Sequence, residues 1–397
     1  MTNKWKFILP WGLLFSSLCT AQQVISEAEV LSLALKNSAL MQVSDLEIQQ
    51  NKYLQKTSFN LSNPDVIAES PTGEFYAVGI LQSVEFPSVY VKQHQLRRQA
   101  TALSEKGKEV ARQDVYRVIR TLYLNLQFME SLHAQLKLQD SLYYQMSINA
   151  ARQFSAGQID YLVKTTAESQ YGEVHNKFIE TQADYETLRN QIKVYAGIAG
   201  DFKATPLSRL RDEGIQNLVN DSSLLAENPS LEYAQQLRKV NAKTLSLERN
   251  KTLPGLVFGY LNQGPKNTPT YYRFRVGFTV PLWFWQYAGN IKAAKTAVQI
   301  AEQNVKAQQQ TLTAEMYQAL GDLKKFDLAL QYYETKGLQY TDDIINASQR
   351  FFESGHTDYT NYLRNIDEAY TIKTRYLETL RNYNQSVITI NYLTGKL

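Results

Sequence analysis

The chain has 397 residues, with 42 lysines and arginines against 38 aspartates and glutamates, four histidines and one cysteine. This near balance of charge gives no reason to expect a nucleic acid or another polyanion as partner. One cysteine cannot make an intrachain disulfide or a cysteine-based metal site.

The first 21 residues have the layout of a secretory signal peptide. Lys4 and Lys6 precede an apolar run over 7–18 that is too short to span a bilayer, and the small-residue site Cys19-Thr20-Ala21 predicts cleavage before Gln22. A lipoprotein interpretation would use Cys19 as the acylated residue, but the bulky Leu18 stands where small residues are expected. Removal of residues 1–21 takes away two lysines and the cysteine, which leaves 40 basic and 38 acidic residues.

No later segment has the 18 consecutive apolar residues of a membrane helix, so a membrane-embedded part would have to consist of β-strands. Long helices are nevertheless expected, because residues 88–205 and 282–397 contain no proline. Apolar residues at alternating steps of four and three predict packed helices from about 89 to 153 and from 288 to 352. The clearest run is Val115, Ile119, Leu122, Leu126 and Met129.

The two halves of the chain resemble each other. Arg152, Phe154, Gly157, Asp160 and Tyr161 recur at a constant offset of 198 as Arg350, Phe352, Gly355, Asp358 and Tyr359. We therefore predict a tandem duplication with a first repeat over 22–205 and a second over 206–397. Each repeat is expected to hold a helix, a strand hairpin and a long helical hairpin whose tip is at Gly157 or Gly355.

Strand hairpins are predicted near 64–87 and 255–281. The second is the clearer, because apolar residues alternate with mixed ones from Tyr271 to Val280, after the turn-rich segment 264–269. Each repeat thus supplies two strands and one chain supplies four, which cannot close a barrel in lipid without leaving edges unpaired. Several copies must then contribute strands to one barrel.

This order of elements, the closing Tyr392-Leu393-Thr394-Gly395 and the segment Phe278 to Leu282 before Gly289-Asn290 resemble the outer-membrane efflux proteins of the TolC type. The resemblance implies a mainly α fold with a membrane β-barrel: a homotrimer with a twelve-stranded barrel above a periplasmic α-barrel of long antiparallel helices. It implies a passive duct for small molecules or metal ions, located in the outer membrane in contact with its lipid. A periplasmic adaptor and an inner-membrane pump would be its partners. Cargo and pump stay open.

By the same resemblance the glycine turns form the periplasmic tip around an aperture, where threefold symmetry would turn each aspartate into a ring of three carboxylates. The alternative for Asp160 and Asp358 is simple N-capping of the next helix, and both roles can hold. Further candidates are Arg152 and Arg350 as tethers or as solvated helix ends, and Tyr161 and Tyr359 as packing or gating residues.

Two groups of residues are assigned to the barrel. Arg273 and Arg275 alternate with the apolar residues of the last strand and are candidates for the lumen, where they would serve solvation or selectivity. Trp283, Phe284 and Trp285 follow that strand and are candidates for an interface belt, or for buried helix packing.

No catalytic, cofactor or metal site is predicted, because the four histidines are far apart and no nucleophile or phosphate-loop motif occurs. The rival function is a periplasmic coiled-coil scaffold or adaptor without a pore of its own. Such a protein would use the strands as a small soluble domain, and its mature chain would dissolve without detergent.

Overall fold

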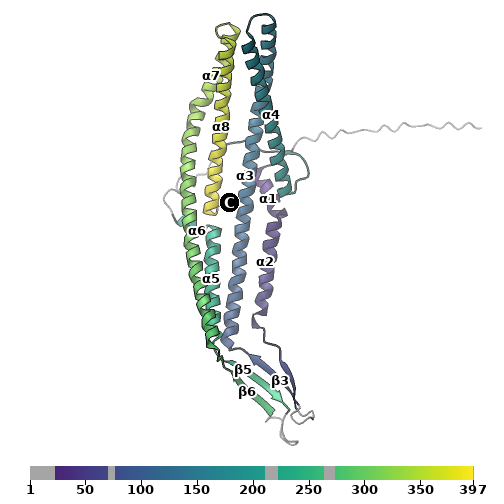
Figure 1. The fold of residues 1–397 in the computed structure, drawn as a ribbon, viewed down its shortest axis with the longest axis vertical. Coiled ribbons are helices and arrows are strands. Elements are labelled where there is room, and N and C mark those ends of the chain that lie inside the picture. The colour runs from purple at the N-terminus through teal and green to yellow at the C-terminus, as the bar shows by residue number, and fades with distance from the viewer. Residues whose placement is uncertain (1–22, 70–76, 211–221, 263–272, 397) are drawn as a thin grey trace, which may run out of the picture.

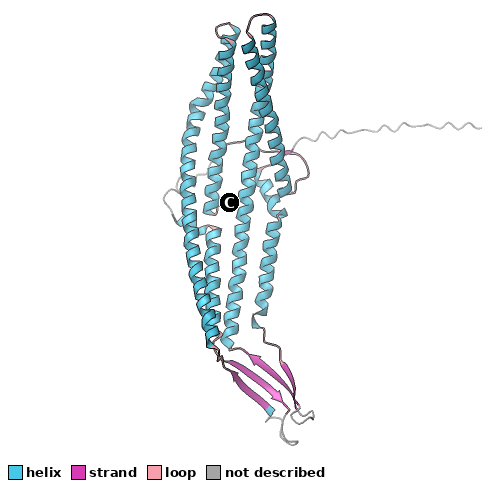
Figure 2. Ribbon diagram, viewed as in Figure 1, coloured by secondary structure: helices cyan, strands magenta, loops and turns pink. Residues whose placement is uncertain are grey.

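A computed structural model describes residues 23–69, 77–210, 222–262 and 273–396 (Figure 1). The chain forms one long rod, with a layer of helices over most of its length and a β-sheet at one end (Figure 2). The turns of two helical hairpins lie at the opposite end. The predicted signal peptide over 1–21 and the predicted turn over 264–269 lie outside the described residues, as do Tyr271 and Tyr272 at the start of the predicted last strand.

The first part of the helical layer consists of two helices that run end to end, α1 (Glu27–Asn37) and α2 (Ala39–Lys56). A capping box begins α1, because the Ser26 hydroxyl accepts the Glu29 N–H while the Glu29 carboxylate accepts the Ser26 N–H. Ser38 separates the two helices and caps α2 through the Met41 N–H. The short helix η1 (Thr57–Phe59) then leads to the sheet.

The first long hairpin consists of α3 (Pro87–Ser155) and α4 (Tyr161–Ala196). Pro87 occupies the first turn of α3, where a missing N–H costs nothing. The 69 residues of α3 span about 100 Å at 1.5 Å per residue. The helix is two residues longer at each end than the periodicity predicted.

The second half repeats this arrangement with one interruption. After η3 (Ser222–Glu227), α5 (Pro229–Asn250) descends to the sheet and α6 (Phe284–Tyr332) rises from it. A π-helical turn over Tyr333–Gly337 then joins α6 to α7 (Leu338–Glu353), and α8 (Tyr359–Thr394) returns. The sequence predicted one unbroken helix over 288–352, whereas the structure bends near the start of α7 (Figure 1).

The sheet has the order β2-β3-β5-β6, and every pair in it is antiparallel. Its strands are β2 (Asp65–Glu69), β3 (Ala77–Val84), β5 (Gly255–Leu261) and β6 (Phe274–Thr279). The strand pair of the first half thus joins that of the second half through β3 and β5. A separate short pair links β1 (Gln23–Val24) to β4 (Phe202–Lys203) in parallel.

The segment between the two halves crosses one face of the helical layer. Gln127 of α3 donates to the Thr205 carbonyl oxygen at 2.9 Å, and Asn384 of α8 bonds to both the Ser208 carbonyl oxygen and the Leu210 N–H. Arg209 reaches Asp327 of α6 and Glu334 of the π turn. We call this side of the layer the linker face. A hollow of about 900 Å³, lined from α3, α6 and α8, lies on the other side.

The long helix α3 and the corresponding stretch from α6 to α7 in the second half, which we call the first and second helical rods, differ in length by one residue. From Phe284 to Glu353 the second rod has segments of 49, 5 and 16 residues, or 70 in all, against 69 in α3. The buried stripes near mid-length correspond at an offset of 197, whereas the turns at Gly157 and Gly355 correspond at 198. The matched stripes are Val115, Ile119, Leu122, Tyr123 and Leu126 in α3 and Leu312, Met316, Ala319, Leu320 and Leu323 in α6.

One additional residue therefore lies between mid-length and tip of the second rod, where the π turn is found. A π turn holds more residues than an α turn, so it absorbs the extra residue. Without the π turn, every side chain between it and the tip would be rotated by about 100° relative to the side chains between it and the sheet. The π turn thus keeps the mid-length and tip clusters of the second rod on the same side.

We expect deletion of Thr335 from the π turn to be tolerated, because the rod then becomes a continuous α-helix with both clusters in register. Deletion of Lys137, at the matched level of the unbroken α3, should cost several kcal/mol. It rotates the tip cluster out of contact, and each buried large side chain exposed costs about 1.5–3 kcal/mol. Thermal unfolding of the two purified variants, followed by circular dichroism, measures the difference. Equal damage from both deletions would refute the role of the π turn.

Candidate functional site

The two hairpin turns at the tip have the same backbone geometry. Gly157 and Gly355 adopt positive φ angles of 71° and 73°, a region that favours glycine. In both turns the glycine N–H and the next N–H bond back to the last helical carbonyl groups, at Phe154 and Gln153 and at Phe352 and Phe351. Nothing lies within 4 Å of a Cβ built on either glycine, so conformation and not space requires this residue.

Asp160 and Asp358 cap the helices that follow these turns. The Asp160 carboxylate accepts the Val163 N–H at 2.9 Å, and the Asp358 carboxylate accepts the Asn361 N–H at 2.7 Å. Asp358 also accepts from the Asn361 side chain at 2.7 Å. Both aspartates stay exposed, so capping leaves their charge at the tip.

The tyrosines that follow these aspartates differ between the hairpins. Tyr359 is 5% exposed, and its hydroxyl donates to the Met146 carbonyl oxygen of α3, which links the second hairpin to the first. Burial raises the pKa of the Tyr359 hydroxyl, so it stays a donor. Tyr161 is 66% exposed, and its ring meets that of Phe154 of its own hairpin edge to face. Tyr359 therefore packs between hairpins, whereas Tyr161 is free for an external contact.

An apolar cluster around Tyr359 holds the two hairpins together near the tip. The rings of Phe352 and Tyr362 stack at 4.7 Å, and Met146 and Ala150 of α3 are buried against this pair. The remaining buried members are Tyr143, Ala167, Leu363 and Ile366. The sequence analysis did not single out Met146 or Tyr362, although both follow the helical apolar period.

Arg152 and Arg350 lie in the last turns of their helices, exposed and favourable to the helix dipole. In the part of the chain that the structure describes, neither arginine forms an ion pair. Their interpretation as solvated helix ends therefore accounts for them within one copy of the chain.

The tip third of the layer is acidic as a whole. The segments 140–175 and 338–370 contain only four basic residues, Arg152, Lys164, Arg350 and Arg364. They contain ten acidic ones, which are Asp140, Asp160, Glu168, Glu173, Asp342, Asp343, Glu353, Asp358, Asp367 and Glu368. The negative potential here is thus a property of the whole end and not of two aspartates alone.

The sheet at the other end has two unlike faces. Val66, Ile80, Phe258, Phe274 and Val276 share one face through the strand register, and each is at least 46% exposed. Arg275 points to the other face between Phe274 and Val276. Arg273 lies two residues before Arg275, just before β6. The alternation of arginines with apolar residues, from which both arginines were assigned to the lumen, is therefore present.

Glycines allow large side chains to lie close against the second face. A Cβ on Gly79 would come within 2.3 Å of the Leu261 side chain, and one on Gly259 within 2.1 Å of Leu81. Each leucine thus covers the glycine opposite it on the neighbouring strand, and a larger residue at either glycine would collide with that leucine.

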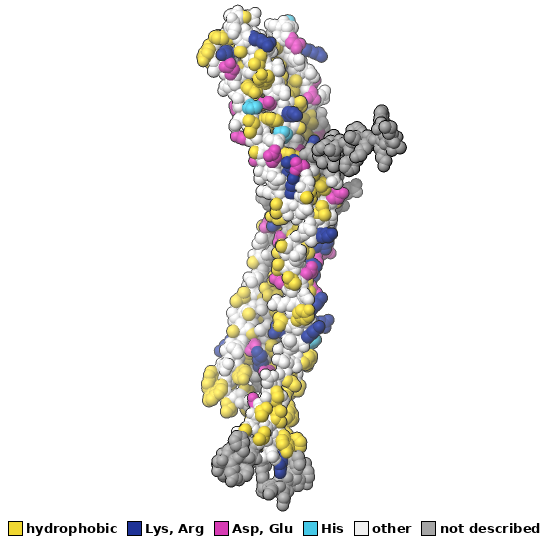
Figure 3. All heavy atoms as spheres, turned by 90° about the vertical axis from the view of Figure 1, so that its right-hand side faces the viewer, with side chains coloured by type: hydrophobic (Ala, Val, Ile, Leu, Met, Phe, Trp, Pro, Cys, Tyr) yellow, Lys and Arg dark blue, Asp and Glu magenta, His cyan; other side chains and the backbone are white. Residues whose placement is uncertain are grey.

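Trp283 directly precedes α6, Phe284 and Trp285 begin it, and the three are 64%, 72% and 61% exposed. Figure 3 shows hydrophobic side chains gathered at this end of the rod. Their exposure argues against buried helix packing in a single copy of the chain.

Among the described helices, none combines the length and apolarity needed to cross a lipid bilayer. Within the same ranges, no group of three or more metal-ligating side chains comes together.

Comparison with known proteins supports the predicted family and fold. Residues 221–396, in the second half of the chain, match the family model for outer membrane efflux proteins. The fold of nearly the whole chain matches solved outer membrane channels, as the mainly helical, TolC-like prediction required.

Three solved structures illustrate the likeness in fold. The CmeC channel of Campylobacter jejuni is 16% identical with a TM-score of 0.77, over 93% of this chain and 85% of that one. VceC of Vibrio cholerae is 10% identical with a TM-score of 0.75, over 93% and 96%. The open-state MtrE channel of Neisseria gonorrhoeae is 13% identical with a TM-score of 0.73, over 93% and 88%. Among curated proteins none matches the sequence.

We expect Tyr359→Phe to loosen the contact between the two helical hairpins. Loss of one hydrogen bond costs about 0.5–1.5 kcal/mol, so amides at the tip should exchange with solvent about two- to tenfold faster. Tyr161→Phe, at the equivalent place in the first repeat, should leave exchange unchanged. Hydrogen exchange followed by mass spectrometry compares the two, and equal rates in both variants would show that Tyr359 does not join the hairpins.

Proposed function

We propose that this protein is the passive outer-membrane duct of a tripartite efflux system, in which three copies share one barrel and one helical tunnel. The observation that carries the proposal is the sheet. Its four strands end in two edges, β2 and β6, that pair on one side only among the described residues. Its apolar face is exposed over the whole width.

Assembly of copies satisfies both features at once. The four strands alternate in direction, so β6 of one copy and β2 of the next run antiparallel and can extend the same sheet. Three copies supply twelve strands, an even number within the range of outer-membrane barrels. The apolar face then meets lipid, Arg273 and Arg275 face a water-filled lumen, and Trp283, Phe284 and Trp285 lie at the membrane interface.

The helical layer extends this duct into the periplasm. In the closed ring the linker face is the outside, and the hollow lined by α3, α6 and α8 faces the tunnel. The acidic tips then surround the far opening, where a periplasmic adaptor and an inner-membrane pump dock. Export to this site requires the segment 1–21 to act as a cleaved signal peptide. Cargo of small molecules or metal ions passes through without chemical change.

The rival interpretation, a soluble periplasmic scaffold or adaptor, fits the sheet poorly. A soluble domain would have to cover Val66, Phe274, Val276 and Phe278, which are 67–75% exposed. The described residues contain no second element that packs over this face.

The purified chain should require detergent, migrate as a trimer and form conducting pores in a planar lipid bilayer. A detergent-free monomer that forms no pore would support the scaffold instead.

Within this pore, Asp160→Asn with Asp358→Asn tests the carboxylate rings. Asparagine caps a helix as well as aspartate does, so the fold should be kept while six charges leave the trimer. We expect preference for cations over anions to fall by about twofold or more in reversal-potential measurements. The alanine pair serves as control, because it removes both cap and charge and should also destabilise the tip. An unchanged preference in the asparagine pair would restrict the aspartates to capping.

A further inference from the structure

The end of the helical layer next to the sheet is basic. Four segments lie there, 48–56 of α2, 87–101 of α3, 236–250 of α5 and 284–298 of α6. Together they contain a single acidic residue, Glu248. They contain eleven basic ones, namely Lys52, Lys56, Lys92, Arg97, Arg98, Arg238, Lys239, Lys243, Arg249, Lys292 and Lys295. The whole chain is nearly balanced, and the tip is acidic, so this charge is a local feature.

Most of these cations are exposed and uncompensated. Eight of them are exposed, and we call this set the basic collar: Lys52, Lys56, Arg98, Arg238, Lys239, Arg249, Lys292 and Lys295. Across the described ranges, no member of the collar forms an ion pair. Glu248, the one nearby carboxylate, is bound instead to Lys251 at 2.7 Å.

On α5 and α6 most collar residues point away from the neighbouring helix. On α5, Gln236, Lys243 and Asn250 contact α3. At 100° per residue, Arg238 and Arg249 point away from these contacts, whereas Lys239 lies at their border, three residues after Gln236 and four before Lys243. On α6, Lys292 lies about 160° from the buried Ala294 and so points away from the packed side of this helix.

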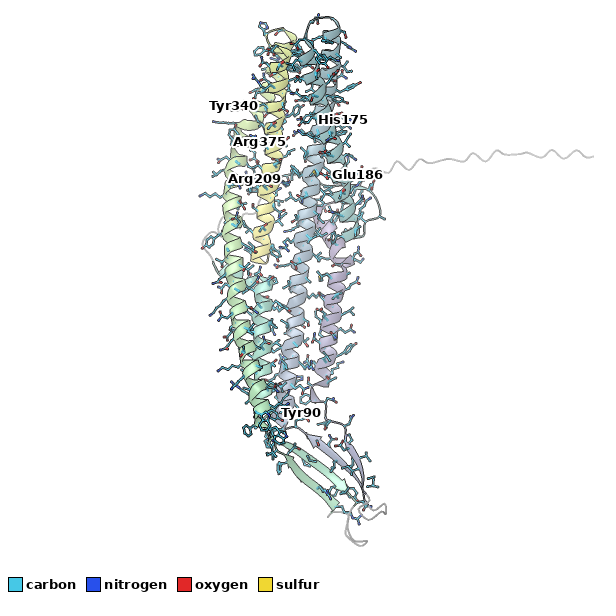
Figure 4. The ribbon with its side chains drawn as sticks, viewed as in Figure 1. Tyr90, His175, Glu186, Arg209, Tyr340 and Arg375 are labelled. Carbon is cyan, nitrogen blue, oxygen red and sulfur yellow. The ribbon has the colours of Figure 1, made fainter. Side chains whose placement is uncertain are left out.

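Figure 3 shows one edge of the helical layer, with dark-blue side chains on the helices beyond the hydrophobic end of the rod. Figure 4 labels Arg209, which crosses the linker face higher up the layer, and Tyr90, which marks the end of α3 next to the sheet. In the proposed duct the collar therefore lies on the helices directly next to the sheet.

The collar continues from the aromatic residues at the end of the sheet. Lys292 follows Trp285 by seven residues, or about 10 Å along α6. An exposed apolar face, an aromatic band and a band of cations thus succeed one another along the rod. That is the order in which a membrane presents hydrocarbon, interface and phosphate groups.

We infer that the basic collar binds the headgroups of anionic phospholipids in the leaflet nearer the helices. The inference rests on the proposed function, because only an inserted sheet brings the collar to that leaflet. Lysine and arginine beside a negatively charged membrane surface are attracted to it within about one Debye length. In a trimer the eight cations of each copy form a continuous ring, which fixes the depth of the barrel and selects its surrounding lipid.

Intrinsic fluorescence can test this directly. Outside residues 1–21, Trp283 and Trp285 are the only tryptophans, and they lie between sheet and collar. The full-length protein, purified from outer membranes, is reconstituted in phosphatidylcholine bilayers that contain either brominated phosphatidylglycerol or brominated phosphatidylcholine. Brominated chains quench tryptophan on contact. At low salt we expect phosphatidylglycerol to occupy the contacts with the tryptophans at least about threefold more often than phosphatidylcholine does. Near 1 M salt we expect this preference to vanish.

Two matched variants separate the collar from charge in general. Arg238→Gln with Lys239→Gln, Lys292→Gln and Lys295→Gln should abolish the preference. Arg364→Gln with Lys137→Gln, Lys177→Gln and Lys324→Gln removes one arginine and three lysines from exposed sites away from the sheet, and should retain it.

The outcomes distinguish the collar from the channel. If both brominated lipids quench equally in the natural protein, or if the two variants behave alike, the collar proposal is overturned while the membrane channel stands. If neither lipid quenches, the sheet is not in the bilayer and the proposed function fails first.

Discussion

The structure depends on the hydrogen-bonding groups at the two edges of a four-stranded sheet. A strand edge in contact with lipid leaves N–H and C=O groups without partners, and each such group costs several kcal/mol. One chain cannot remove its own edges, since β2 and β6 lie at opposite sides of a short sheet. Neighbouring copies can, and the ring of copies then defines the tunnel that the long helices continue. In the proposed function, the oligomer, the pore and the membrane location all follow from this single constraint.

The charge of the rod follows the same axis. Exposed cations gather beside the sheet, and carboxylates gather at the tips. In the proposed duct, the cations would face a phosphate-rich membrane surface and the carboxylates would surround an opening that favours cations. Between the ends the second rod contains a π turn, which Arg209 contacts through Glu334 and which compensates one additional residue. The two repeats are therefore alike in their caps and turns but not in the packing of Tyr161 and Tyr359.

Local signals in the sequence predicted most of the fold. Proline-free stretches predicted the long helices, the alternation of apolar and polar residues predicted β5 and β6, and Gly157 and Gly355 predicted the turns. Each of these signals acts within a few residues of the chain. The π turn was missed because a one-residue insertion shows only when two buried stripes are compared in three dimensions. The Tyr359 bond to Met146 was missed for a similar reason, since its partners are 213 residues apart. The collar was not predicted because its cations are scattered over four segments of a chain whose charges are nearly balanced overall.

Cross-linking of the sheet edges tests the central claim most directly. Cys19 is the only native cysteine, so Val66→Cys on β2 can be combined with Phe274→Cys, Val276→Cys or Phe278→Cys on β6, all on the apolar face. A disulfide forms only when the two Cβ atoms lie about 3.5–4.5 Å apart. The account predicts that one of these pairs oxidises between copies to give dimers and trimers and nothing larger, while Val66→Cys with Arg275→Cys, on opposite faces, does not. Absence of cross-links in every pair, or a ladder that continues beyond three chains, would contradict it.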